Sequence, residues 1–170
     1  MKKLFFFLLV LLNLTVVNAQ VKLDTSNYTV INNNTMHSTT LEKGYKFADL
    51  TEIEISQLEV ILTKSIDNYN STEIKYCDSV NQKITRRNRK IHPHLIVDIS
   101  KYKMQFIVTI SPKGEKTVWA NCFCSSANDV AFKNWRQDIV IVSDGGQCFF
   151  NLDINLTTKE FTTLSVNGVA

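Results

Sequence analysis

The sequence predicts an α+β fold in which one long helix packs on a curved antiparallel sheet of four to six strands. Two observations support this prediction: an amphipathic helical pattern in the first half of the chain, and a series of short β-prone segments that follows it. Of the 170 residues, 44% are hydrophobic and 21% are charged. This composition excludes a disordered or fibrous chain and is typical of one globular domain.

Residues 1–19 have the pattern of a secretory signal peptide. Two lysines precede an unbroken apolar run from Leu4 to Leu12, and Val17 and Ala19 stand at the positions that signal peptidases require. We therefore expect cleavage after Ala19 and a secreted or periplasmic protein with no transmembrane segment. The remaining 151 residues carry 17 basic and 16 acidic side chains, so the net charge falls from +3 to +1. This small charge argues against a nucleic-acid partner.

Residues 20–44 are polar and rich in Asn and Thr, apart from one β-prone run at 28–31. We expect a loosely ordered N-terminal arm there, followed by a single α+β domain over residues 45–170.

A helix is predicted over residues 51–69. Thr51 and Glu54 have the spacing of a capping box, and the apolar positions that follow share one helical face. These are Ile55, Leu58, Ile61, Leu62, Ile66 and Tyr69. Asn and Ser at 68–71 favour an end to the helix. The next stretch, up to residue 90, is compatible with either a second, weaker helix or a loop.

Beyond Pro93 the sequence predicts strands separated by short turns. The β-prone runs are 95–100, 104–111, 116–124, 138–143, 147–156 and 161–166. The turn Ser111–Gly114 and the Asp144-Gly145-Gly146 hairpin signal indicate antiparallel neighbours. Residues 125–137 are too polar for a strand, and we expect a short helix carrying Phe132 and Trp135. A short strand near 45–47, the helix and then the strands make up a cystatin-like element order.

Alternation along the strands sorts their residues into two faces. The inner set comprises Met104, Phe106, Val108, Ile110, Val118, Ala120, Cys122, Cys124, Cys148, Phe150, Leu152, Ile154 and Leu156. The outer set combines aromatic rings with amides and a carboxylate: Trp119, Asn121, Phe149, Asn151, Asp153 and Asn155. Because Asn and Asp are depleted in strands, this outer set is a candidate binding surface. An ordinary solvated sheet face would have the same pattern.

Four cysteines, Cys77, Cys122, Cys124 and Cys148, are candidates for disulfides after export. Cys122 and Cys124 share a face with their Cα atoms about 6.5 to 7 Å apart, which is too far for a comfortable bridge between them. Cys148 is a natural partner for either, and all three pairings remain open. No recognised metal-ligand spacing occurs, so we expect no metal and no cofactor.

Five basic residues form the main charge asymmetry: Lys83, Arg86, Arg87, Arg89 and Lys90. No acidic residue lies between Asp78 and Asp98. In an exported protein such a run favours an anionic glycan or a lipid headgroup, although a solvated helix end has the same composition.

Several segments together resemble a known group of proteins. They are Leu50-Thr51, Glu54-Ile55, Tyr69-Asn70, KTVWANCFC at 116–124, Trp135, DGGQCFFN at 144–151 and the terminal VNGVA at 166–170. These motifs resemble a family of uncharacterised exported proteins from Bacteroidota. The resemblance implies an exported single-domain protein and no activity, cofactor or catalytic residue.

We therefore expect a non-enzymatic binding or structural module with an unknown ligand or envelope protein as its partner. One alternative is a cysteine-dependent enzyme, with Cys122 or Cys124 as nucleophile and His92 or His94 as base. The other is a proteinase-inhibitor-like domain, suggested by the element order alone.

Overall fold

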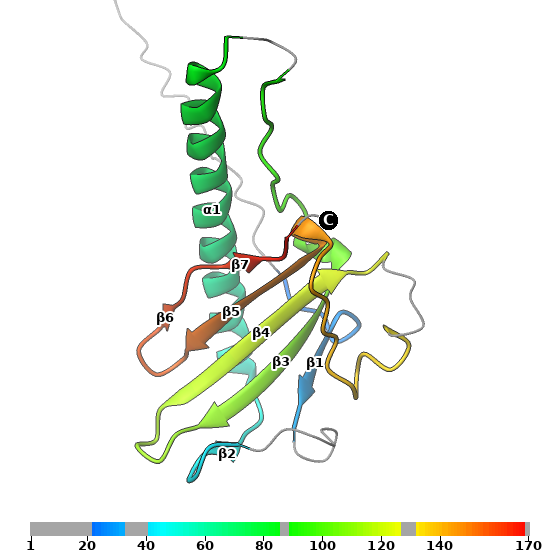
Figure 1. The fold of residues 1–170 in the computed structure, drawn as a ribbon. Helices are drawn as coiled ribbons and strands as arrows, with labels where there is room; N and C mark the ends of the chain where they lie inside the picture. The colour runs from blue at the N-terminus through cyan, green and yellow to red at the C-terminus, as the bar shows by residue number, and fades with distance from the viewer. Residues whose placement is uncertain (1–21, 33–40, 86–88, 127–131, 169–170) are drawn as a thin grey trace, which may run out of the picture.

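The computed structural model describes residues 22–32, 41–85, 89–126 and 132–168, and it has one long helix on a sheet (Figure 1). The expected signal peptide lies outside these residues. The elements in chain order are β1 (Tyr28–Ile31), β2 (Lys46–Phe47), α1 (Glu52–Lys83), β3 (Tyr102–Ile110), β4 (Lys116–Cys124), β5 (Phe149–Asn155), β6 (Glu160–Phe161) and β7 (Ser165–Val166). The α+β class is confirmed. No helix in the described ranges has the length and apolarity needed to cross a bilayer.

The sheet is mixed rather than antiparallel throughout. Its order is β1-β3-β4-β5-β6, with β2 also on β3 and β7 also on β5. β1 runs parallel to β3, because the long connection through β2 and α1 returns the chain in the same direction. The other strand pairs are antiparallel. This parallel pair corrects the antiparallel prediction, and the cystatin-like order is not established.

The segment predicted as a loosely ordered arm contributes to the sheet where it is described. All four residues of β1 pair with β3, and Leu23 and Ile31 are buried. The predicted strand near 45–47 is present as β2, which pairs with the end of β3. Together the two short strands cover one edge of β3.

The start of α1 confirms the predicted capping box. Thr51 accepts a hydrogen bond from the Glu54 backbone N–H at 3.3 Å, and Glu54 accepts one from the Thr51 backbone N–H at 2.8 Å. The predicted apolar face packs on the inner face of the sheet. Leu58, Ile61, Leu62 and Ile66 join Met104, Phe106, Val108, Val118, Ala120, Cys122, Phe150, Leu152 and Ile154 in one buried cluster.

α1 continues to Lys83 instead of ending near residue 69, and therefore includes the segment whose structure the sequence left open. Asn70, one of the residues that favoured an end, and Asn81 both use their side chains to bind the extended segment that follows. Asn70 donates to the Ile96 carbonyl and accepts from the Ile96 N–H, at 2.8 and 2.9 Å. Asn81 bonds Ile91 in the same two ways, at 2.8 and 2.9 Å.

Two predicted strands are absent from the described sheet. Residues 95–100 continue the extended segment along α1 and enter a 3₁₀ turn, Ile99–Lys101. Residues 138–143 form no ladder, because their backbone groups bond to side chains of β3 and β4. The Asp-Gly-Gly motif is therefore no hairpin turn, and it leads into the 3₁₀ turn Gly146–Cys148 before β5.

The Asp-Gly-Gly motif and the C-terminal Asn-Gly motif contact one another. Gly146 donates its N–H to the Gly168 carbonyl at 3.0 Å, and the Asn167 side chain donates to the carbonyls of Val142 and Asp144. Gly145 has φ of +93°, and a Cβ there would collide with the Phe149 ring. This position therefore requires glycine.

Candidate functional site

The register of the central strands arranges the outer sheet face in four rows. From one end to the other they are Lys103–Phe123–Phe149, Gln105–Asn121–Asn151, Ile107–Trp119–Asp153 and Thr109–Thr117–Asn155. All twelve residues lie opposite the face that α1 covers. The six predicted surface residues are therefore on one face, as alternation indicated.

A segment of the chain's own covers part of this face. The segment 132–142, which we call the cap, lies on the opposite side of the sheet from α1 (Figure 1). Trp135 and Val140 of the cap are buried against Phe123 of β4, and Phe132 and Val142 are partly buried around them. The Phe123 ring lies 5.7 Å from Phe132 and 6.0 Å from Trp135 between centroids. The first row is therefore the floor of a second small core.

A buried amide pair holds the cap on the second row. Gln105, fully buried on β3, accepts hydrogen bonds from the Val140 N–H and the Asn121 amide at 2.9 and 3.0 Å. Its own amide donates to the carbonyls of Trp135 and Asp138. Asn121 also donates to the Val140 carbonyl at 2.7 Å. These bonds use the full capacity of the Gln105 side chain.

The cap is also tied to the sheet edge beside β1. Arg136 donates to the carbonyls of Thr25, Ser26 and Tyr28 at 2.8 to 3.0 Å. Its guanidinium lies 4.4 Å from the centroid of the Trp135 ring. The cap therefore bonds one carbonyl of the edge strand β1 and two in the turn before it.

Two of the six predicted surface residues are thus structural. Asn121 is 8% exposed and Phe149 lies against Phe132, so neither faces an open surface. Alternation assigned their face correctly, but it does not show that the polar segment between them in the sequence folds back over both residues. The pair Phe132 and Trp135 was the available signal, since apolar rings in a polar loop require cover.

The rest of the face is open around Trp119, which is half-buried, and Asp153, which is exposed. Asn151 and Asn155 are half-buried beside them. Asn155 accepts hydrogen bonds from the N–H groups of Thr157 and Thr158 at 2.9 and 3.1 Å, so it also shapes the turn before β6. Among the described residues, the side chains of the other three predicted residues, Trp119, Asn151 and Asp153, make no hydrogen bond or ion pair.

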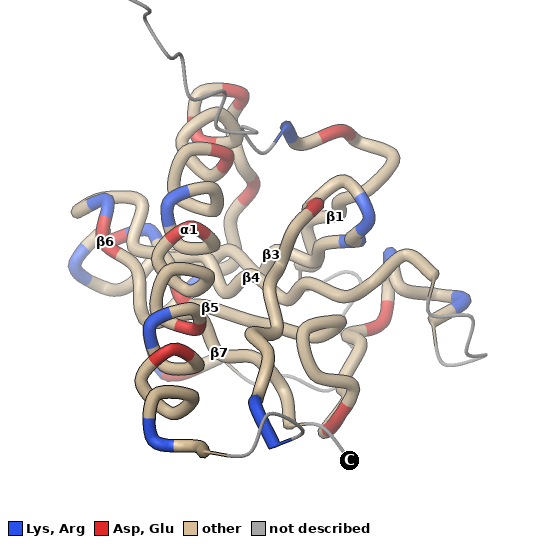
Figure 2. The backbone as a smooth tube through the Cα atoms, turned by 90° about the horizontal axis from the view of Figure 1, so that it is seen from above, with Lys and Arg blue, Asp and Glu red and all other residues tan. Residues whose placement is uncertain are grey.

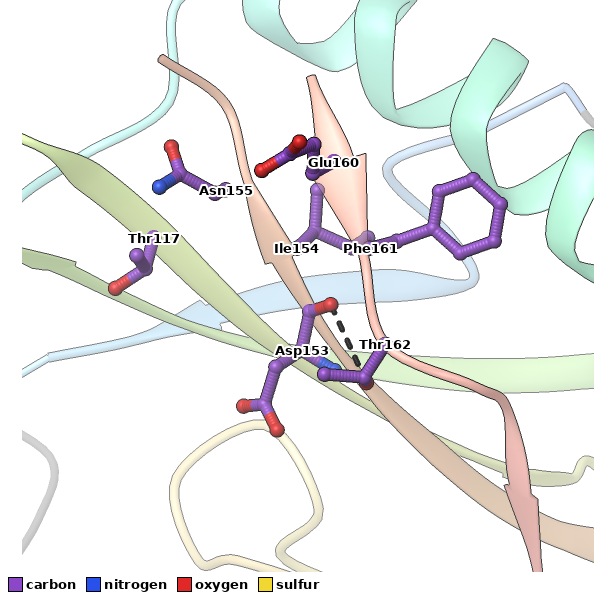
Figure 3. Close-up of a pocket in the computed structure, with 7 residues that line it drawn as sticks. All are labelled: Thr117, Asp153, Ile154, Asn155, Glu160, Phe161 and Thr162. Carbon is purple, nitrogen blue, oxygen red and sulfur yellow. Dashed lines mark hydrogen bonds between the residues drawn. The ribbon is translucent and has the colours of Figure 1, made fainter. Parts of the chain in front are cut away.

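A pocket of about 460 Å³ lies at the β5–β6 end of this open part. It is lined by Thr117, Asp153, Ile154, Asn155, Glu160, Phe161 and Thr162. Figure 3 shows the Phe161 ring directed toward α1, whereas the Asp153 carboxylate points the other way. Asp153 and Thr162 are joined through backbone and hydroxyl groups at 2.9 and 3.0 Å, which fixes β6 beside β5. The polar wall of the pocket is therefore held by the sheet.

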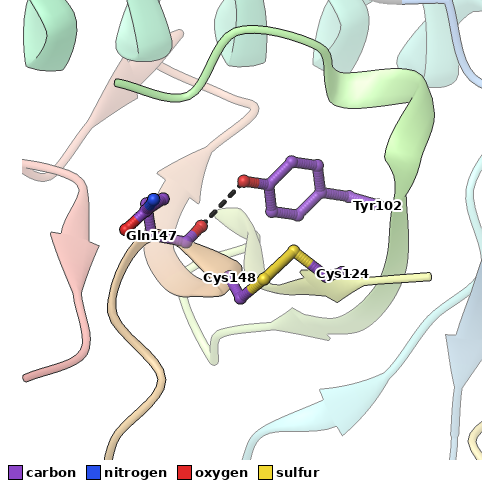
Figure 4. The surroundings of a disulfide bond; sticks show 4 residues. All are labelled: Tyr102, Cys124, Gln147 and Cys148. Carbon is purple, nitrogen blue, oxygen red and sulfur yellow. Dashed lines mark hydrogen bonds between the residues drawn. A yellow bond between two sulfur atoms is a disulfide. The ribbon is translucent and has the colours of Figure 1, made fainter. Parts of the chain in front are cut away.

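Cys124 and Cys148 form a disulfide, with Cα atoms 4.9 Å apart (Figure 4). It joins the end of β4 to the start of β5, as the inner-face assignment favoured. Tyr102 lies beside it and donates to the Gln147 carbonyl at 2.8 Å. Burial raises the pKa of Tyr102 to about 12, so it remains a neutral donor. Cys77 and Cys122 are free and buried.

Neither cysteine proposed as a nucleophile is an accessible thiol. Cys124 is bonded to Cys148, and burial raises the pKa of the Cys122 thiol well above its usual range. A catalytic cysteine needs the opposite shift and access to a substrate. His92 and His94 are exposed on the extended segment beside α1. Among the described residues, no three His, Cys, Asp or Glu side chains are grouped as a metal site would require.

The predicted basic residues lie at the C-terminal end of α1 and just beyond it. Lys83, Arg89 and Lys90 are exposed, and Arg86 and Arg87 lie outside the described residues. Figure 2 shows basic and acidic positions interspersed along α1. The described part of this run is remote from the cap and the open face.

Comparisons with known proteins add no relative to this description: no family model, no curated protein and no solved structure matches the chain.

Proposed function

We propose that the protein is an exported, non-enzymatic binding module whose contact surface is the open part of the outer face. We call this surface the open face and define it by Trp119, Asn151, Asp153 and the pocket residues Asn155 and Glu160. Its occupant would be an external ligand or an envelope partner.

The observation that carries the proposal is the unequal cover of one sheet face. The cap encloses the aromatic residues of the first row and the Gln105 and Asn121 amides of the second, yet it leaves Trp119 partly exposed to solvent. A large aromatic ring with an unused N–H is a frequent anchor in interfaces, because it adds apolar area and one directional bond. The Asp153 carboxylate beside it has no ion pair in the part of the chain that the structure describes.

Site-specific photo-cross-linking in the native host tests this surface. A benzophenone amino acid replaces Trp119 in one variant and Ile53, an α1 residue 73% exposed, in the control. We expect a reproducible adduct only at position 119. In parallel, Trp119→Ala should abolish binding to the cross-linked component and leave the urea midpoint nearly unchanged. A folding defect in Trp119→Ala, or equal adducts at both positions, would refute the proposal.

Export is part of the same proposal and has its own test. The intact mass of the protein recovered from the envelope or medium should correspond to a chain that begins at Gln20. A full-length mass in the cytosolic fraction would contradict export. The described residues offer no observation that favours the cysteine enzyme or the proteinase inhibitor as a second candidate.

A further inference from the structure

We infer that the pocket between β5 and β6 binds a neutral carbohydrate, with Trp119 as the platform for a sugar ring. This inference rests on the proposed function and names the class of ligand. The pocket volume of about 460 Å³ falls within the range of roughly 300 to 1,000 Å³ that is usual for small-molecule sites.

The first argument is the mixture of donors and acceptors in the wall. Because the Asn155 side-chain oxygen already accepts two backbone N–H groups, its amide nitrogen remains as a donor. The Asp153 carboxylate on the same face accepts no hydrogen bond from any described residue, so it remains available as an acceptor. Thr117 adds a hydroxyl that is shared with Thr109 at 2.9 Å. A ligand that fits this wall must both donate and accept, and sugar hydroxyl groups do both.

The second argument is charge. Two carboxylates, Asp153 and Glu160, line the pocket, and no lysine or arginine does so. An anionic ligand would therefore meet repulsion and lack a partner for its charge. A compact cation would match the carboxylates but leave the Asn155 donor unused. A neutral polyhydroxylated ligand satisfies both kinds of group.

The third argument is the position of the indole. Trp119 is the direct cross-strand partner of Asp153, and Thr117 follows on the same face. Cross-strand partners have Cβ atoms about 4.5 to 5.5 Å apart, so the Trp119 and Asp153 side chains start from neighbouring positions on this face, with Trp119 beside the residues that line the pocket. A pyranose ring has one C–H-rich face and a hydroxyl rim. The ring face would cover the indole while the rim bonds to Asp153 and Asn155.

Calorimetric titration of the chain lacking residues 1–19 tests the inference. The probes are maltopentaose, cellopentaose, xylopentaose, mannopentaose and chitopentaose, each raised to 10 mM. We expect at least one to bind, with affinity at least tenfold weaker in Trp119→Ala and in Asp153→Asn. Two matched controls, Ile141→Ala and Asp144→Asn, change exposed residues outside the pocket and should bind like the unmodified chain.

The remaining outcomes overturn the inference in distinguishable ways. No heat with any probe, together with a retained Trp119-dependent cross-link, would reject a carbohydrate ligand and leave the binding module in place. Salt-sensitive binding of tetralysine that is lost in Asp153→Asn would instead assign the pocket to cationic ligands. If no probe binds and no cross-link forms at position 119, the proposed binding module is refuted together with the carbohydrate ligand.

Discussion

At the scale of single residues, the side chain that most constrains the outer face is Gln105. It is fully buried, and each of its hydrogen-bonding groups has a partner in the cap or in Asn121. The Val140 N–H can only donate, so it sets the orientation of the Gln105 amide. A buried amide with all its partners specifies one arrangement of the cap, because any shift would leave a polar group unpaired.

Gln105→Leu should therefore destabilise the protein strongly. The substitution keeps most of the volume but leaves the Val140 N–H and two carbonyls without their partner, at about 1 to 3 kcal/mol for each unsatisfied group. We expect a loss of at least about 2 kcal/mol in urea unfolding. Gln137→Leu, at an exposed position of the same segment, should change stability by less than about 0.5 kcal/mol. Equal effects of the two substitutions would contradict the role of Gln105.

Glu54 makes stability depend on pH. Partial burial raises its pKa, but hydrogen bonds from Lys116 and Thr51 and the charge of Lys116 outweigh burial, so the pKa is lower than the usual 4.5. A lowered pKa in the folded state stabilises the protein above the unfolded value, and that stabilisation is lost as the pH falls through the folded value.

Glu54→Gln should accordingly lose about 1 kcal/mol at neutral pH, since the capping bonds weaken and the 2.8 Å ion pair with Lys116 is removed. The difference from the unmodified protein should shrink as the pH is lowered below 4.5. Urea unfolding at several pH values measures both effects, with Glu52→Gln as the control in the same helical turn. If the difference in unfolding free energy between the two proteins did not change with pH, the charge of Glu54 would not be the source of the stabilisation.

At the scale of elements, the two attachment points on α1 are as far apart as the two residues that they bind on the extended segment. Eleven residues separate Asn70 from Asn81 on α1, which is a rise of about 16.5 Å. Five residues separate Ile91 from Ile96 on the extended segment, which span about the same distance. The matching distances allow Asn70 to bond the backbone of Ile96 while Asn81 bonds that of Ile91. The extended segment therefore runs antiparallel to the helix.

Hydrogen exchange should detect these two attachments separately. Asn70→Ala should accelerate exchange of the Ile96 amide, and Asn81→Ala that of the Ile91 amide, because each N–H loses its acceptor. We expect at least a tenfold increase at the paired site and little change at the other. Asn68→Ala, whose side chain is exposed, is the control. Unchanged exchange at Ile91 and Ile96 would mean that the asparagines do not hold the segment.

At the scale of the whole molecule, the disulfide closes the loop that carries the cap. Cys124 and Cys148 are 24 residues apart, and the cap lies between them. The bridge is near the α1 side of the sheet, whereas the cap covers the other side. The bridge therefore restricts the unfolded chain over the segment that includes the cap.

The double variant Cys124→Ser/Cys148→Ser should lose about 3.5 kcal/mol, the chain-entropy value for a loop of this length. Urea unfolding with and without dithiothreitol measures the effect. Reductant should lower the stability of the unmodified protein toward that of the variant and leave the variant unchanged. A variant as stable as the oxidised protein would show that the cap does not depend on the bridge.

Prediction from the sequence succeeded where the signal is local or alternating. The Thr51 capping box, the turn at Ser111–Gly114 and the inner faces of β3, β4 and β5 are present as expected. It failed at Asn70, whose preference for a helix end is outweighed by two bonds to Ile96, 26 residues away. It also failed at Asn121, because facing outward from the sheet and being open to solvent are different properties.

The sequence by itself determined the class of fold, the start of α1 and the faces of the central strands, because these depend on residues within a few positions of one another. Only the tertiary structure decided the parallel pairing of β1, the full length of α1 and the extent of the open face. Each of these depends on distant partners, as between Gln105 and Val140, 35 residues apart. A hydrogen bond between residues so far apart in the sequence produces no periodic pattern from which it could be predicted. It nevertheless determines which part of the outer face is open to a ligand.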